Sequence, residues 1–191
     1  GSWTILAPAD ESAAGADRAA AADLHVQDHV FPNGLRLIVR EDSRLPMAHV
    51  AAVLGGGLLA ETDGQAGVSQ LAADLLTRGT SRHTAAELAE ILESRAVSLG
   101  SFSGRNSYGL SAAGLSEDLP LMLDVVAACL LDSQFPEEEL EKQRALQLAG
   151  IRRALEKPMT HAQQMVRDAF FPGHPYRFAP HGDPATVAAL A

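Results

Sequence analysis

The sequence is short of cysteine, of basic residues and of long apolar runs, and each shortage excludes a class of protein. Its single cysteine, Cys129, cannot close a disulfide within the chain, and its place on an apolar helical stripe indicates a buried thiol. With 15 Lys and Arg against 24 Asp and Glu, the net charge of −9 lacks the basic footprint of a nucleic-acid-binding protein. No apolar run approaches the roughly 20 residues that a membrane-spanning helix needs.

The composition that remains is typical of a globular domain. Hydrophobic residues make up 47% of the chain and charged residues 20%, and 191 residues suffice for one domain plus an extra segment. The first residues show no signal-peptide pattern, but Gly1 and Ser2 resemble the scar of an expression tag. A targeting segment upstream therefore stays open, and the sequence does not give the compartment.

Residues 1–23 are interpreted as a segment outside the main domain. An apolar, strand-like run, WTILAP, is followed by DESAAGADRAAAAD, which is rich in Ala and Asp and has no apolar periodicity. This order fits the tail of a preceding domain with a linker, and it fits a loose N-terminal extension equally well. The main domain is expected over residues 24–191.

Local signals predict strands in the first part of this domain. An Asn33–Gly34 turn separates two apolar runs, which is a strong hairpin signal. A second run, 47–54, ends at three glycines, 55–57, which no phosphate-binding motif surrounds, so they indicate the end of a strand. Two more strands are expected on either side of a turn at 104–106.

Apolar periodicity and capping signals predict the helices. A long helix is expected to follow Phe135, with three glutamates in its first turn, where acids favour the positive end of the helix dipole. The residues expected to cap or end helices are Thr84 with Glu87, Ser116, Pro158, and Thr160 with Gln163.

One pair of histidines, His25 and His29, has the spacing of metal ligands, in H-x-x-D-H. The pair lies where the linker gives way to a β pattern, and residues four apart share a face on a helix but not on a strand. We interpret the spacing as chance. No G-x-S-x-G elbow supports a serine triad.

The stretch Gly64–Thr80, GQAGVSQLAADLLTRGT, predicts an amphipathic helix. Its apolar residues recur at the i, i+3, i+4, i+7 spacing of one buried face, and Gln70, Ala73, Asp74 and Thr77 fall in register on another. The pattern alone is typical of an ordinary core helix with a solvated polar face.

The same stretch resembles the signature helix of the insulinase/pitrilysin family of zinc metallopeptidases, whose inverted motif is H-x-x-E-H within G-x-A-H-F-L-E-H-M-x-F-x-G-T. The glycines, most apolar residues and the closing Gly-Thr are in place. The chemistry is absent, because Gln70 and Asp74 occupy the histidine positions and Ala73 occupies that of the glutamate.

The long helix extends the resemblance. It is similar to the family pattern F-x-x-E-x-x-E-K-E-R-x-x-x-x-x-E-I at four positions, Glu138, Glu141, Lys142 and Arg144. Gln143 falls on a glutamate typical of the family, and Gly150 falls on the third zinc ligand. For Gly150, close approach of a neighbouring helix and simple drift after loss of the ligand are both open readings.

The resemblance implies an α+β fold, an antiparallel-rich sheet with helices packed on one face, as in insulinase and mitochondrial processing peptidase. Such a domain normally continues through a further helix and strand beyond Ala191, so this one is expected to be truncated. The expected source is bacterial, and the compartment, periplasm or cytoplasm, stays open.

For function, the resemblance implies a non-catalytic domain that pairs with a zinc-bearing half or subunit around a peptide-binding chamber. This chain itself is expected to hold no metal and no catalytic residue, with zinc in the partner. The candidate wall of the chamber is the set of vacated motif positions, Gln70, Ala73, Asp74, Gln143 and Gly150. An active zinc endopeptidase with displaced ligands and a purely structural subunit, as in the respiratory-complex core proteins, remain alternatives.

Overall fold

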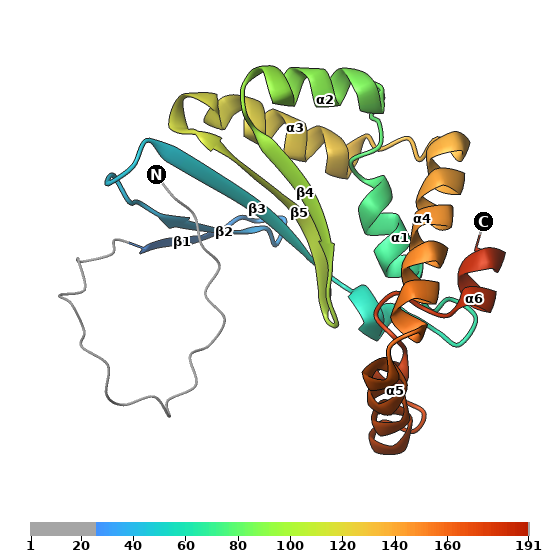
Figure 1. Ribbon diagram of the computed structural model, residues 1–191. Helices are drawn as coiled ribbons and strands as arrows, with labels where there is room; N and C mark the ends of the chain where they lie inside the picture. The colour runs from blue at the N-terminus through green and yellow to red at the C-terminus, as the bar shows by residue number, and fades with distance from the viewer. Residues whose placement is uncertain (1–25, 191) are drawn as a thin grey trace.

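Two antiparallel sheets and a set of helices make up the fold (Figure 1). The structure, a computed structural model, describes residues 26–190, so the predicted strand and linker at 3–23, and His25, lie outside the described residues. The strands are β1 (Val26–Val30), β2 (Arg36–Arg40), β3 (Met47–Gly55), β4 (Ser98–Ser103) and β5 (Ser107–Leu115). The α-helices are α1 (Val68–Leu75), α2 (Ala85–Ser94), α3 (Leu119–Leu131), α4 (Glu137–Leu155), α5 (Pro158–Phe170) and α6 (Pro184–Ala189). Short 3-10 helices are η1 (Gly57–Ala60), η2 (Ser116–Asp118) and η3 (Pro175–Arg177).

The predicted hairpin is confirmed as β1 and β2, which form a sheet of their own. The strands pair from Val26 with Arg40 to Val30 with Arg36. The connection is longer than a two-residue turn, and Gly34 adopts a φ of +86°, a conformation that glycine tolerates without strain. Figure 1 shows the hairpin as a separate two-stranded sheet, outside the three-stranded main sheet.

The main sheet has the order β3-β5-β4, with both pairs antiparallel. Figure 1 shows α1, α2 and α3 on one face of this sheet, which confirms the predicted α+β class. Side chains from the sheet and these helices form the core. Its buried members are Ala48, Leu76, Leu88, Leu92, Val97, Leu110, Ala112, Met122, Val125, Val126 and Cys129.

The triple glycine 55–57 ends β3, as predicted. Its last residue, Gly57, also allows two backbone segments to approach each other closely. β3 stops at Gly55, and Gly57 begins η1 with a φ of +67°. A Cβ on Gly57 would lie 2.3 Å from the carbonyl oxygen of Gly104 in the β4–β5 turn. Only glycine therefore allows η1 to pack against this turn, which positions the segment that leads into α1.

The local prediction for α2 is confirmed. Thr84 Oγ1 accepts a hydrogen bond from the Glu87 backbone, and the Glu87 side chain accepts one from the backbone N–H of Thr84. This reciprocal arrangement is the capping box that the spacing predicted.

Two other predicted caps are wrong. Ser116 begins the 3-10 turn η2, and α3 starts only after Asp118, with Pro120 in its first turn. Thr160 lies inside α5, which begins at Pro158, because proline fits the first helical turn, where no N–H partner is needed. At Ser116 a tertiary contact, the hydrogen bond from its backbone N–H to the Pro46 carbonyl, accompanies the later start of α3. At Thr160 another local signal, the proline at 158, decides where α5 begins.

Cys129 lies fully buried in α3, as the apolar stripe predicted. Burial raises the pKa of its thiol to about 11, because the thiolate would lose its hydration. Since the thiolate is the reactive form, we expect native protein at pH 8 to react with a disulfide reagent only as fast as it unfolds. The measurement is the rate of thiol release with and without denaturant. Rapid reaction of native protein would show that the thiol is accessible.

α4 lies outside the first helical layer and packs on α1 and α6 (Figure 1). Its buried side chains are Gln143, Gln147 and Ile151, at i, i+4 and i+8. Among residues 26–190, no helix is long and apolar enough to cross a lipid bilayer.

Candidate functional site

The site is organised by α1, whose first turn is held by a buried carboxylate. Glu61 Oε2 accepts a hydrogen bond from the Gly67 backbone at 2.9 Å, and Oε1 accepts one from Ser69 at 3.0 Å. Glu61 is only 4% exposed. A negative charge here satisfies two N–H groups that α1 leaves free and complements the positive end of its dipole. Glu61 thereby fixes the helix that carries the vacated motif.

The two histidine positions of the motif are joined by a hydrogen bond. Gln70 Nε2 donates to Asp74 Oδ2 at 2.9 Å, one helical turn away. The other carboxylate oxygen of Asp74 accepts from Ser101 Oγ of β4 at 3.1 Å. Both oxygens of Asp74 are thus occupied by neutral donors, and the side chain links α1 to the sheet.

Ala73, at the position of the catalytic glutamate, is fully buried, with 0% exposure. It therefore packs in the interior next to the half-exposed Gln70 and Asp74. A methyl group has no proton to give or take, so general base chemistry is absent at this position.

Of the two α4 candidates, Gln143 is buried and Gly150 is exposed. Seven residues bring a helix back to within about 20° of the same direction. The two positions therefore share the side of α4 that includes its buried stripe, and α4 packs on α1. That Gln70, Asp74, Gln143 and Gly150 surround one point stays a prediction.

The space around Gly150 tests one of the two explanations for a glycine at this position, the close approach of a neighbouring helix. No atom of another described element lies within 4 Å of where its Cβ would be. Close approach of a neighbouring helix is therefore the wrong explanation for this glycine. Loss of the ligand followed by drift remains a prediction.

Gln147, which the sequence did not single out, makes the contact between α4 and the start of α1. Its Nε2 donates to the Gly67 carbonyl at 3.0 Å and to the His181 carbonyl at 2.9 Å. A Cβ on Gly67 would lie 2.9 Å from this amide nitrogen and 2.8 Å from the His181 carbonyl oxygen. The family frame has glycine at this position, and the structure shows why a side chain would not fit.

The donor set does not fit zinc. Zinc binds Cys, His, Asp or Glu, and a hydrolytic site needs three of them plus water. Of the vacated positions only Asp74 carries such a group, and its oxygens already accept two hydrogen bonds. Over residues 26–190, no three His, Cys, Asp or Glu side chains are close enough together to hold a metal ion.

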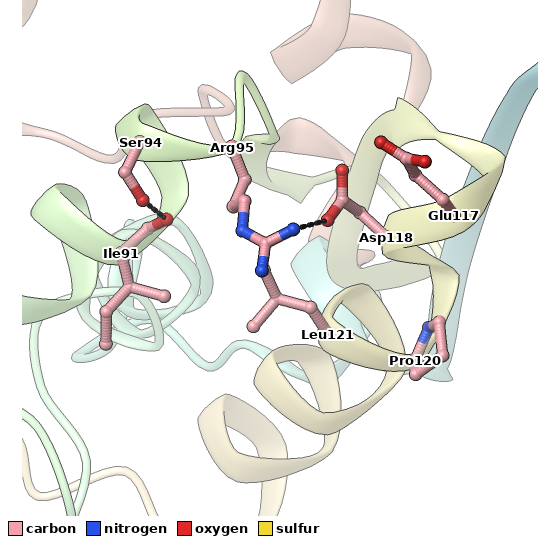
Figure 2. A pocket seen from close by; sticks show the side chains of 7 residues that line it. All are labelled: Ile91, Ser94, Arg95, Glu117, Asp118, Pro120 and Leu121. Atoms are coloured by element: carbon pink, nitrogen blue, oxygen red, sulfur yellow. Dashed lines mark hydrogen bonds and ion pairs between the residues drawn. The ribbon is translucent and has the colours of Figure 1, made fainter.

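Two cavities lie elsewhere. One, of about 370 Å³, opens between the end of α2 and the start of α3, where Arg95 Nη1 donates to Asp118 Oδ1 at 3.1 Å (Figure 2). Asp118 is buried, so this ion pair joins the two helices, and none of the vacated positions lines the cavity. The other, of about 360 Å³, is largely apolar and touches α1 through Ser69 and Ala72, on a different side from Gln70 and Asp74.

Three contacts of the candidate site could not be predicted from the sequence, because each depends on tertiary packing. Glu61 reaches α1 from a preceding loop, Ser101 reaches Asp74 across 27 residues, and Gln147 reaches Gly67 across 80 residues. For Glu61 a signal did exist, since an acid shortly before a glycine-led helix is a natural partner for the helix N-terminus.

Comparisons with known proteins identify the family and the fold. The sequence profile of insulinase (peptidase family M16) matches residues 36–179. An uncharacterized zinc protease of Mycobacterium leprae is 26% identical over 175 residues, which are 92% of this chain and 39% of that protein. The β subunit of the mitochondrial-processing peptidase of Bos taurus is 26% identical over 136 residues, 71% of this chain and 27% of the relative.

A solved structure, the peptidase M16 inactive domain from Pseudomonas fluorescens, superposes with a TM-score of 0.81. It is 20% identical and covers 88% of this chain and 41% of its own, so the likeness shows the fold. This chain thus spans about two fifths or less of the length of these relatives. The profile match covers well over half of the chain, and the chain belongs to the insulinase (peptidase M16) family.

Proposed function

We propose that this chain is a non-catalytic unit of an M16 peptidase, which pairs with a zinc-bearing homologous half and forms part of its peptide-binding chamber. One observation carries the proposal. The signature helix keeps its frame and its packing, while Asp74, its one remaining potential ligand, is bound by Gln70 and Ser101. The helix is maintained as structure without metal chemistry.

The peptide-binding part of the proposal is supported by the position of β4. This strand pairs only with β5 among the described residues, so its other edge has free backbone N–H and C=O groups. An extended peptide can add to such an edge as a further strand. Ser101 of β4 contacts Asp74, so a peptide on this edge would lie next to the polar face of α1.

The first test is the metal content and activity of the purified chain. We expect no stoichiometric zinc and no cleavage of quenched fluorescent peptides, because within the described part of the chain, 26–190, no three His, Cys, Asp or Glu side chains lie close enough together to bind a metal ion. Elemental analysis that finds one tightly held zinc per chain would favour the alternative of an active peptidase with displaced ligands.

The second test adds the zinc-bearing half, identified by an intact H-x-x-E-H in the same gene or its neighbour. We expect the two chains to form a complex that cleaves the peptides faster than the half alone. Gln70→Lys should reduce this gain by changing the proposed wall, and Gln27→Lys, on the exposed strand β1, is the matched control. A complex that is equally active with Gln70→Lys would favour a purely structural role.

A further inference from the structure

Asp74 is a half-buried carboxylate without a cationic partner in the described part of the chain. Its oxygens accept hydrogen bonds from two neutral groups, Gln70 Nε2 at 2.9 Å and Ser101 Oγ at 3.1 Å. None of the ion pairs among residues 26–190 includes Asp74, although Arg78 follows it by four residues. A charge that is partly removed from water is normally paired with an opposite charge. The site therefore favours the arrival of a cation.

The Asp74 carboxylate can accept further hydrogen bonds. The two oxygens of a carboxylate offer about four acceptor positions, and the bonds from Gln70 and Ser101 occupy two of them. The two donors belong to different elements, α1 and β4, so together they hold the side chain in one orientation. A cation that binds here meets a carboxylate that is already ordered, which lowers the entropy cost of binding.

β4 places the edge of a sheet beside this carboxylate. It is an edge strand of the main sheet, and α1 packs against it (Figure 1). Side chains along a strand alternate between its two faces. Leu99 packs against the core and Ser101 contacts Asp74, so both point to the face that the helices cover. Gly100 and Phe102, between and after them, belong to the other face.

An extended peptide that pairs with the free edge of β4 would follow the same alternation. The peptide residue directly opposite Ser101 would point its side chain to the helix-covered face, with its Cβ about 4.5–5.5 Å from that of Ser101. Ser101 Oγ itself lies 3.1 Å from Asp74 Oδ1. A long side chain at this position of the peptide can therefore reach the carboxylate, while the residues before and after it point away.

From this geometry we infer that the chain selects basic peptides, and that Asp74 binds the Arg or Lys side chain opposite Ser101. The inference rests on the proposed function and names its substrate class. The formal net charge of −9 acts in the same direction, because it attracts basic peptides and repels acidic ones. An acidic side chain opposite Ser101 would bring two carboxylates together, and an apolar one would cover the Asp74 charge without pairing it.

Binding of short strand-forming peptides to the purified chain tests the inference. Two fluorescently labelled peptides of alternating Thr and Val differ at one central residue, which is arginine in one and citrulline, its uncharged isostere, in the other. We expect the arginine peptide to bind at least about fivefold more tightly at low salt, as measured by fluorescence anisotropy. The ratio should fall as salt is added, because salt screens charges that are partly exposed.

Asp74→Asn removes the charge and keeps an acceptor oxygen for Ser101, so it should bring the ratio of the two affinities to about one. Asp124→Asn makes the same change of charge on the exposed face of α3 and is the matched control, which should keep the preference for arginine. Circular dichroism of both variants confirms that they fold.

Equal binding of the two peptides to the parent chain would overturn the inference and leave the β4 edge as a peptide site. A preference for arginine that survives Asp74→Asn would overturn the role of Asp74. If neither peptide binds, the β4 edge is not a peptide site, and both the inference and the peptide-binding part of the proposed function are wrong. Formation of a complex with the zinc-bearing half would still test the pairing part on its own.

Discussion

Replacing Gln70 and Asp74 by histidine and Gly150 by glutamate is expected to create a zinc site where the parent chain has none. The two histidines would lie at i and i+4 on one side of α1, and the glutamate would come from α4, which packs on it. The surroundings of Gly150 favour the change, because no atom of another described element lies within 4 Å of its Cβ position. We expect zinc affinity to rise by at least about a hundredfold over the parent.

The matched control is the double variant that lacks only the Gly150 change, which has two ligands instead of three. Affinity is measured by zinc titration against a competing chelator, with circular dichroism to confirm folding. If the triple variant folds yet binds zinc no better than the parent, the three substituted positions do not surround one point, and the family correspondence on α4 is wrong. Peptidase activity is not expected, because catalysis also needs an oriented water and a closed chamber.

Adding Ala73→Glu to this variant is expected to harm the protein. Ala73 has no exposed surface, so a glutamate there must displace packed neighbours and lose hydration. The packing around Ala73 thus leaves no room for a larger side chain, whereas the space at Gly150 is open.

Much of the fold followed from local sequence signals. The capping box of Thr84 and Glu87, the hairpin around Gly34 and the burial of Cys129 all depend on residues close together in the chain. Ser116 shows the limit of such signals. Its backbone N–H donates to the Pro46 carbonyl, and α3 starts later, after Asp118, whose carboxylate is bound by Arg95. Contacts across the sheet therefore moved a boundary that the local pattern placed too early.

For the candidate site, the sequence identified which chemistry was missing but not what replaced it. The spacing on α1 placed Gln70 and Asp74 on one side, and the structure adds the hydrogen bonds between them and to Ser101. The contacts of Glu61 and Gln147 arise only when distant segments pack together, so periodicity could not reveal them. These contacts hold the start of α1 in place, so removing one of them should lower the stability of the fold.

Glu61→Ala is expected to reduce the free energy of unfolding by about 2–4 kcal/mol. The substitution leaves the backbone N–H groups of Gly67 and Ser69 without their carboxylate acceptor, in a region where Glu61 itself is 4% exposed. It also removes a negative charge from the positive end of the α1 dipole. The measurement is urea denaturation followed by circular dichroism, with attention to whether the slope stays constant.

Glu61→Gln separates the charge from the hydrogen bonds. Glutamine keeps one acceptor oxygen, so we expect it to lose about half as much stability as alanine does. Glu90→Ala, on the exposed face of α2, is the matched control for removing a glutamate and should change stability by less than about 0.5 kcal/mol. If Glu61→Ala is no more destabilising than Glu90→Ala, the buried carboxylate is not what fixes α1. The persistence of the signature helix without its metal would then need another cause.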